Sequence, residues 1–202
     1  MKEIQENTED KWDKLLKIRT GGRDDTKADE YYYPYEPTPY AVLERLSAAG
    51  YIGKKNLLID YGCGKGRVGL FLSWQNRCKS IGVEFDERLF KRAEENRIGS
   101  VSGNRSCFML TKAEEYEVPE DADRFYFFNP FSSEIMMRVL KKIIEQNYVN
   151  PKERYLFFYY PSSEYLNCLE NEAGTEHVED IDCTDLFEND DEREKISVWK
   201  IY

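Results

Sequence analysis

The sequence is short of several residues on which common protein chemistries depend. It has one histidine, His177, in 202 residues, and no second histidine or cysteine lies close to it in the chain. A histidine-dependent mechanism is therefore disfavoured. The five cysteines are scattered, include no Cys-x-x-Cys pair and fit free thiols in a reducing compartment better than disulfides or zinc ligands: Cys63, Cys78, Cys107, Cys168 and Cys183. The sequence thus predicts no metal site.

Long apolar runs and an excess of positive charge are also missing. Residues 1–10 are polar and charged, without the apolar core of a signal peptide, and no run approaches the length of a membrane span. We therefore expect a cytoplasmic protein with no membrane partner. The 29 basic against 39 acidic residues give a net charge of -10, which disfavours nucleic acid as a partner without excluding a local basic patch.

Apolar segments with strand-like and helix-like patterns alternate along most of the chain. Strands are predicted at residues 57–60, 80–84, 106–110, 124–128, 154–160, 177–181 and 196–201. Helices are predicted at residues 39–49, from 67, from 87 to 99, from 133, and from 163 to about 169, with Thr38, Asp86, Ser132 and Ser162 as caps. Successive strand–helix units predict a parallel sheet with right-handed crossovers, and the last two strands predict a hairpin containing an antiparallel strand.

The first 37 residues read as an appendage to a main domain formed by residues 38–202. Residues 8–19 predict a short amphipathic helix that places Trp12, Leu15, Leu16 and Arg19 on one face. The stretch 31–40 then holds five tyrosines and three prolines, a composition that excludes a helix and favours an extended segment. Such a segment suits a lid that excludes water from a site, and it equally suits a cover for a sheet edge.

The chain is organised around a glycine-rich turn that follows the first strand. Its sequence from Asp60 is Asp-Tyr-Gly-Cys-Gly-Lys-Gly-Arg, which runs from an apolar strand into a helix and lets a nucleotide lie against bare backbone. Gly64, Gly66 and Gly69 also match the dinucleotide fingerprint, so a nicotinamide-dependent oxidoreductase is one alternative.

The Asp-x-Gly-x-Gly-x-Gly register resembles motif I of the class I S-adenosylmethionine-dependent methyltransferases. The resemblance implies a Rossmann-like, doubly wound α/β fold with about seven mostly parallel strands, helices on both faces and a C-terminal β-hairpin. It implies S-adenosyl-L-methionine as cofactor. An acid at the strand end would repel a diphosphate but attract an ammonium and a sulfonium. The resemblance places the methionine end of the cofactor against Asp60, Tyr61, Gly62, Cys63, Gly64 and Gly66.

Two later segments supply the remaining cofactor contacts that the resemblance implies. Glu84, at the end of the second strand and followed by Phe85, would accept both ribose hydroxyls. After the third strand, Lys112 stands where many family members have an acid, so adenine would rest on the backbone N–H of Ala113, with Glu114 a substitute acceptor.

The segment Asn129-Pro130-Phe131, at the end of the fourth strand, resembles a shortened motif IV of N-methyltransferases, with Phe131 in place of a second proline. The resemblance implies that these residues orient a nitrogen acceptor, with Asn129 also beside the cofactor. We expect transfer of a methyl group to a nitrogen of a small molecule or protein side chain. The shortened motif leaves open a non-catalytic module that binds the cofactor without transfer.

Overall fold

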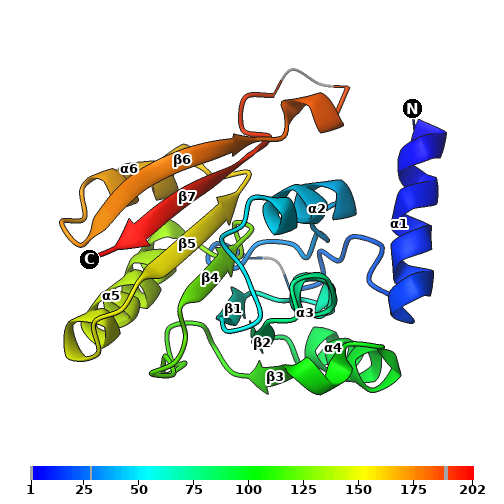
Figure 1. Cartoon of the computed structure of the whole chain (residues 1–202), viewed down its shortest axis with the longest axis horizontal. Helices are drawn as coiled ribbons and strands as arrows, with labels where there is room; N and C mark the ends of the chain where they lie inside the picture. The colour runs from blue at the N-terminus through cyan, green and yellow to red at the C-terminus, as the bar shows by residue number, and fades with distance from the viewer. Residues whose placement is uncertain (1, 28, 189–190) are drawn as a thin grey trace.

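A seven-stranded sheet forms the centre of the molecule (Figure 1). The computed structural model describes residues 2–27, 29–188 and 191–202. Neighbouring strands follow the order β3-β2-β1-β4-β5-β7-β6. The first five are β1 (Leu57–Tyr61), β2 (Lys79–Glu84), β3 (Ser106–Leu110), β4 (Arg124–Phe127) and β5 (Arg154–Tyr159), followed by β6 (Thr175–Asp182) and β7 (Lys195–Ile201).

The five strands β1 to β5 are parallel, and β7 runs antiparallel between β5 and β6. The predicted mostly parallel sheet with its C-terminal hairpin is therefore confirmed. Dinucleotide-binding folds usually have the order 3-2-1-4-5-6. The insertion of β7 before β6 separates this sheet from that arrangement.

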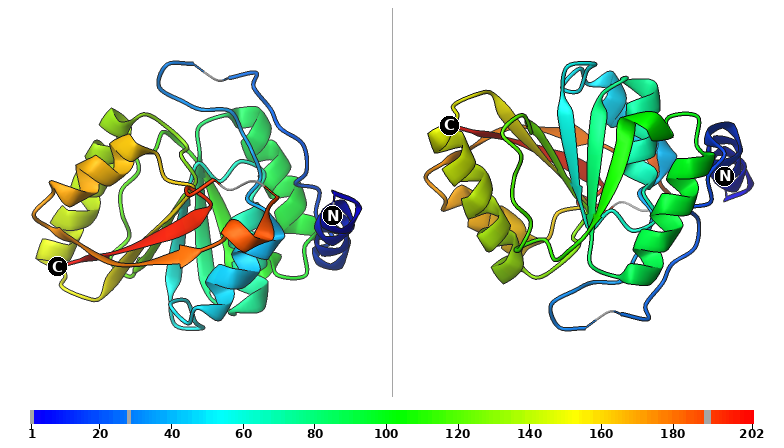
Figure 2. Two further views of the ribbon diagram at one scale, coloured as in Figure 1. Left: turned by 90° about the horizontal axis from the view of Figure 1, so that it is seen from above. Right: turned by 90° about the horizontal axis from the view of Figure 1, so that it is seen from below.

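Helices cover both faces of the sheet (Figure 2). One face carries α2 (Tyr40–Ala48), α3 (Arg67–Gln75) and α4 (Glu87–Gly99), and the opposite face carries α5 (Ser133–Val149) and α6 (Ser163–Glu170). Single turns of 3-10 helix lie at Gly103–Arg105 and Thr184–Leu186. Each face has its own apolar core, and side chains of β4 alternate between the two: Tyr126 contributes to the first, and Phe125 and Phe127 to the second. The sheet is thus buried on both sides, as a parallel sheet requires.

Three of the predicted helix caps are confirmed by side-chain hydrogen bonds. Asp86 accepts from the backbone N–H of Arg88, and Ser132 and Ser162 each accept from the amide three residues onward. The cap predicted at Thr38 is wrong, because α2 begins after Pro39 and the Thr38 hydroxyl instead lies 3.0 Å from the phenol oxygen of Tyr126. A buried partner has displaced the local capping bond.

The N-terminal helix α1 spans Lys2–Leu16, so it begins and ends earlier than the sequence pattern predicts. Trp12 packs on Phe71 with ring centroids 4.9 Å apart, and Leu16 is fully buried. Leu15 is 51% exposed, and Arg19 lies beyond the helix end, so the predicted four-residue face is only half right. No helix among the described residues is long and apolar enough to cross a membrane.

Candidate functional site

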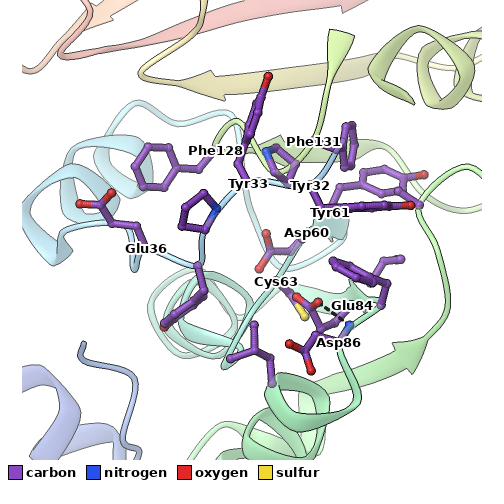
Figure 3. Close-up of a pocket in the computed structure, with 18 of the residues that line it drawn as sticks. Tyr32, Tyr33, Glu36, Asp60, Tyr61, Cys63, Glu84, Asp86, Phe128 and Phe131 are labelled. Atoms are coloured by element: carbon purple, nitrogen blue, oxygen red, sulfur yellow. Dashed lines mark hydrogen bonds between the residues drawn. The ribbon is translucent and has the colours of Figure 1, made fainter. Parts of the chain in front are cut away.

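A pocket opens at the carboxyl ends of β1, β2 and β4, where the glycine turn, the β2–α4 loop and the β4–α5 loop meet (Figure 3). Parallel sheets gather the ends of their strands at one edge, and ligands of such sheets bind there. Nine residues predicted from the sequence line this pocket: Asp60, Tyr61, Gly62, Cys63, Glu84, Phe85, Ala113, Pro130 and Phe131. Gly64, Gly66, Lys112 and Asn129 are not among the residues that line it.

The backbone of the glycine turn lies so close to neighbouring residues that a Cβ on Gly62 or Gly64 would collide with them. Gly62, Gly64 and Gly66 have φ values of 71°, 54° and 84°, a region that favours glycine. A Cβ on Gly62 would lie 2.3 Å from Pro130, and one on Gly64 would lie 2.1 Å from the ring of Tyr35. The turn after β1 is therefore pressed against both the β4–α5 loop and the N-terminal segment.

Among the carboxyl groups that line the pocket, Asp60 has the most strongly raised pKa. Its side chain is buried, and its Oδ2 atom has no hydrogen-bond partner among the described residues. Burial, and then the nearby carboxylate of Glu84, raise the pKa of Asp60 to about 8. A buried acceptor without a partner is costly, and a cationic donor entering the pocket would relieve that cost.

Glu84 has a different environment from Asp60. Its two oxygens accept from the backbone N–H groups of Gly64, at 2.8 Å, and Asp86, at 2.9 Å. Burial nevertheless raises the pKa of Glu84 to about 7. These bonds fix the carboxylate between the glycine turn and the start of α4, and both Glu84 and Asp60 line the pocket (Figure 3).

Residues 31–37, here called the roof segment, cover the pocket from the N-terminal side. Tyr32 lies on Phe85 with ring centroids 4.1 Å apart, and its hydroxyl donates to the carboxylate of Glu114 at 3.2 Å. Tyr35 covers Gly64 and donates its hydroxyl to the carbonyl of Thr20 at 2.6 Å. The roof segment is extended, as its prolines predict, and it lies over the site.

The roof segment is anchored on both sides. An antiparallel bridge joins Tyr32 to Phe131, and the Tyr33 amide donates to the carbonyl of Pro130 at 3.2 Å. On the other side, the buried guanidinium of Arg67 bonds to the Thr20 hydroxyl at 2.7 Å and the Thr38 carbonyl at 3.0 Å, and it also pairs with Glu9 of α1. One buried cation at the start of α3 thus holds α1, Thr20 and Thr38, the residue that directly follows the roof segment.

Asn129 does not line the main pocket, although Pro130 and Phe131, which follow it in the motif, do. Asn129 has a φ of 38°, and its amide donates to the carbonyl of Tyr160 at 2.6 Å and accepts from the N–H of Ser162 at 3.2 Å. Its side chain therefore joins the ends of β4 and β5, and the residue lines a neighbouring hollow. Pro130 and Phe131 line the main pocket.

At the β3 side of the pocket, Ala113 is buried and Lys112 is exposed. Glu114, a substitute acceptor in the sequence reading, already accepts the Tyr32 hydroxyl. Two positions that sequence reasoning passed over also shape the site: Arg67 and Phe128. The turn motif ends at Arg67, and nothing in its spacing shows that the side chain is buried under α1.

No family model matches the sequence. A search of curated proteins finds a segment of 89 residues that is 30% identical to a protein-lysine N-methyltransferase from Saccharolobus islandicus. The match covers 43% of this chain and 53% of that protein, so the chain aligns with about half the length of this relative.

Solved structures of methyltransferases share the fold. An RNA methyltransferase from Salinibacter ruber, in complex with S-adenosyl-L-homocysteine, has a TM-score of 0.62 at 17% identity and covers 82% of this chain and 94% of its own. A TehB-like SAM-dependent methyltransferase from Corynebacterium glutamicum has a TM-score of 0.54 at 16% identity, and the alignment covers 100% of this chain and 99% of that chain. The chain therefore has the class I methyltransferase fold, and the resemblance inferred from motif I is confirmed at this level.

Proposed function

We propose that the protein is an S-adenosylmethionine-dependent methyltransferase that acts on a nitrogen of a small molecule or protein side chain. The observation that carries the proposal is the unpartnered Oδ2 of Asp60, buried at the glycine turn beside the carboxylate of Glu84. Two buried acids at this place suit a cation and a ribose, and they oppose a diphosphate. The neighbours of the same fold support the cofactor class, and the curated relative supports a nitrogen acceptor.

The residues present fit this cofactor. Asp60, Gly62, Gly64 and Gly66 would hold its methionine end, with Tyr61 and Cys63 beside them. Glu84 would accept the ribose hydroxyls, and Phe85, Lys112 and Ala113 would surround the adenine. When bound, the cofactor supplies an activated methyl group on a sulfonium, and the protein contributes position and a dry pocket.

The β4–α5 loop would position the acceptor. Pro130 and Phe131 line the pocket beside Gly62, and the Asn129 amide holds the loop to Tyr160 and Ser162. In this arrangement Asn129 acts on the acceptor through the shape of the loop. Orientation of the nitrogen lone pair toward the methyl group is the main catalytic device that such a loop provides.

The roof segment would close the pocket during transfer. Tyr32 and Tyr35 cover Phe85 and Gly64, and Gly21 and Gly22 precede the segment as flexible connections. The division into an N-terminal part, residues 1–37, and a methyltransferase domain, residues 38–202, follows from this role. Water exclusion by a closed roof would strengthen every polar contact inside the pocket.

Titration calorimetry with S-adenosylhomocysteine, NAD and NADP tests the cofactor. We expect S-adenosylhomocysteine alone to bind, and Glu84→Ala to weaken it about 100-fold through the loss of two charge-assisted hydrogen bonds. The control is Glu117→Ala, because that side chain is 90% exposed and lies outside the pocket. Binding of NAD in preference, or unchanged affinity of a folded Glu84→Ala protein, would refute the assignment.

Transfer itself is measured with a methyl-labelled cofactor and a panel of amines and proteins. We expect label in a nitrogen-containing acceptor. Binding of S-adenosylhomocysteine without transfer to any member of the panel would instead support a cofactor-binding module.

A further inference from the structure

A second hollow lies beside the main pocket, on the other side of the roof segment. The two share walls, because Tyr33, Pro34, Glu36, Pro37 and Phe128 line both. We call the second one the side hollow; its remaining lining residues are Arg23, Pro39, Asn129, Tyr159, Tyr160, Phe187 and Glu194. A molecule in the side hollow would lie against Asn129, the residue that precedes the Pro130 wall of the main pocket.

Five of the twelve residues that line the side hollow are aromatic: Tyr33, Phe128, Tyr159, Tyr160 and Phe187. Phe128 and Tyr159 lie with ring centroids 4.7 Å apart, and the Tyr159 and Tyr160 centroids are 6.2 Å apart. Tyr33, on the roof segment, is 42% exposed and, like Phe128, lines both hollows (Figure 3). Aromatic faces pack well on an aliphatic chain and attract an alkylammonium group.

The charge in the side hollow is negative. Glu194 is a buried residue, with an exposed fraction of 7%. Its carboxylate accepts the Tyr159 hydroxyl at 2.7 Å and forms no ion pair with any described residue. Burial raises the pKa of Glu194. Of the nearby arginines, Arg23 bonds to Asp25 and also lies 3.7 Å from Glu36, so Glu36 is partly neutralised. Arg193 bonds to Asp191 and lies over the Tyr160 ring, 4.3 Å from its centroid. Glu194 is therefore the carboxylate of the side hollow that has no ion-pair partner among the described residues.

We propose that the side hollow receives the acceptor, the side chain of a lysine on a substrate protein. The butyl chain would lie on Phe128 and Tyr33 and pass the carboxylate of Glu194. The nitrogen would then reach the main pocket beside Glu36 and Phe128, which line both hollows. The inference rests on the proposed function, because the side hollow opens beside the pocket assigned to the cofactor. An RNA acceptor is disfavoured because phosphate groups would meet these carboxylates and a net charge of -10.

The reaction balances without a further reactant. The lysine ammonium first releases one proton to water, and the nitrogen lone pair then forms the new N–C bond as the S–C bond breaks. The sulfur keeps that electron pair and becomes a neutral thioether. The product is a methylated ammonium.

The inference is tested with a lysine-rich peptide that has a blocked N-terminus, the same peptide with every lysine acetylated, and an arginine-rich peptide. Calorimetry in the presence of S-adenosylhomocysteine measures peptide binding, and methyl label measures transfer. We expect the lysine peptide alone to bind and to be labelled. Glu194→Gln should weaken its binding about tenfold and leave S-adenosylhomocysteine affinity unchanged.

The matched control is Glu192→Gln, which removes the same charge from an exposed neighbour outside the side hollow. Glu36→Gln, on the roof segment, is a second variant with the same expected loss, so the test does not depend on the folding of Glu194→Gln. Absence of S-adenosylhomocysteine binding would refute the proposed function. Cofactor binding together with equal use of the acetylated peptide, or with labelling of an RNA oligonucleotide in preference, would overturn this inference alone.

Discussion

Replacement of Asp60 by asparagine separates the role of its charge from the role of its shape. In the structure the carboxyl is buried, its Oδ2 lacks a partner among the described residues, and its pKa is raised from 3.8 to about 8. Between these two pH values the folded protein keeps a proton that the unfolded chain releases. The stability contributed by this group therefore falls as the pH rises from 4 to 8 and is constant above that range.

The size of the effect follows from the same two values. Between pH 5 and pH 8, retention of the proton by Asp60 changes the free energy of unfolding by on the order of 3 kcal/mol. Asp60→Asn has no proton to lose and keeps the shape of the neutral acid. We therefore expect the ligand-free variant to be more stable than the parent protein at pH 8, and this difference to shrink by about that amount at pH 5.

Urea unfolding at pH 5, 7 and 8 measures the difference, with Asp121→Asn, an exposed acid, as control. The same variant should bind S-adenosylhomocysteine about 10- to 100-fold more weakly, because a charge-assisted hydrogen bond to the ligand ammonium is lost. A stability difference that does not change with pH would refute the buried, unpaired carboxyl. Unchanged affinity would refute its role toward the cofactor.

Three further changes test how the roof segment is held. Gly64→Ala should lower the free energy of unfolding in urea by about 1–3 kcal/mol, because the added methyl would meet the Tyr35 ring. In a double-mutant cycle, the same substitution should destabilise the Tyr35→Ala protein by less than it destabilises the parent protein. Tyr35→Phe removes the bond to the Thr20 carbonyl and should speed S-adenosylhomocysteine release about fivefold in stopped-flow measurements; an unchanged rate would show that the roof does not gate release. Arg67→Met leaves Glu9 without its cation and should destabilise the protein by about 3 kcal/mol and speed tryptic cleavage within residues 1–37, whereas equal cleavage would contradict the anchor.

Most of the fold was predictable because it depends on local chemistry. Apolar runs set the strands, and Asp86, Ser132 and Ser162 cap helices through bonds made within three residues of the chain. Thr38 shows where local chemistry fails, since its hydroxyl meets Tyr126, 88 residues away. Leu15 fails for a related reason, because α1 packs through Trp12 and Leu16 and leaves it exposed.

The candidate site also contains residues that the sequence predicted and residues whose positions depend on the fold. Asp60 lies one residue before the end of β1, and Glu84 ends the adjacent parallel strand β2. The predicted parallel sheet and the resemblance to motif I together placed both at one sheet edge. The side chain of Asn129 was less predictable, because its orientation depends on a positive φ and on Tyr160 and Ser162 from the next strand and helix. Glu194 was not singled out, since its neighbourhood in the chain is acidic throughout and only the fold buries it beside Tyr159.

The roof segment explains why the acceptor is harder to read from the sequence than the cofactor. Its residues Tyr33, Pro34 and Glu36 line both the main pocket and the side hollow. Closure over the cofactor therefore also shapes the wall that an acceptor would contact. The glycine turn requires a fixed backbone and so carries a recognisable motif, whereas an acceptor wall needs only rings and carboxylates at suitable places. Many sequences satisfy that need, and the acceptor must be identified from three-dimensional contacts such as those of Glu194.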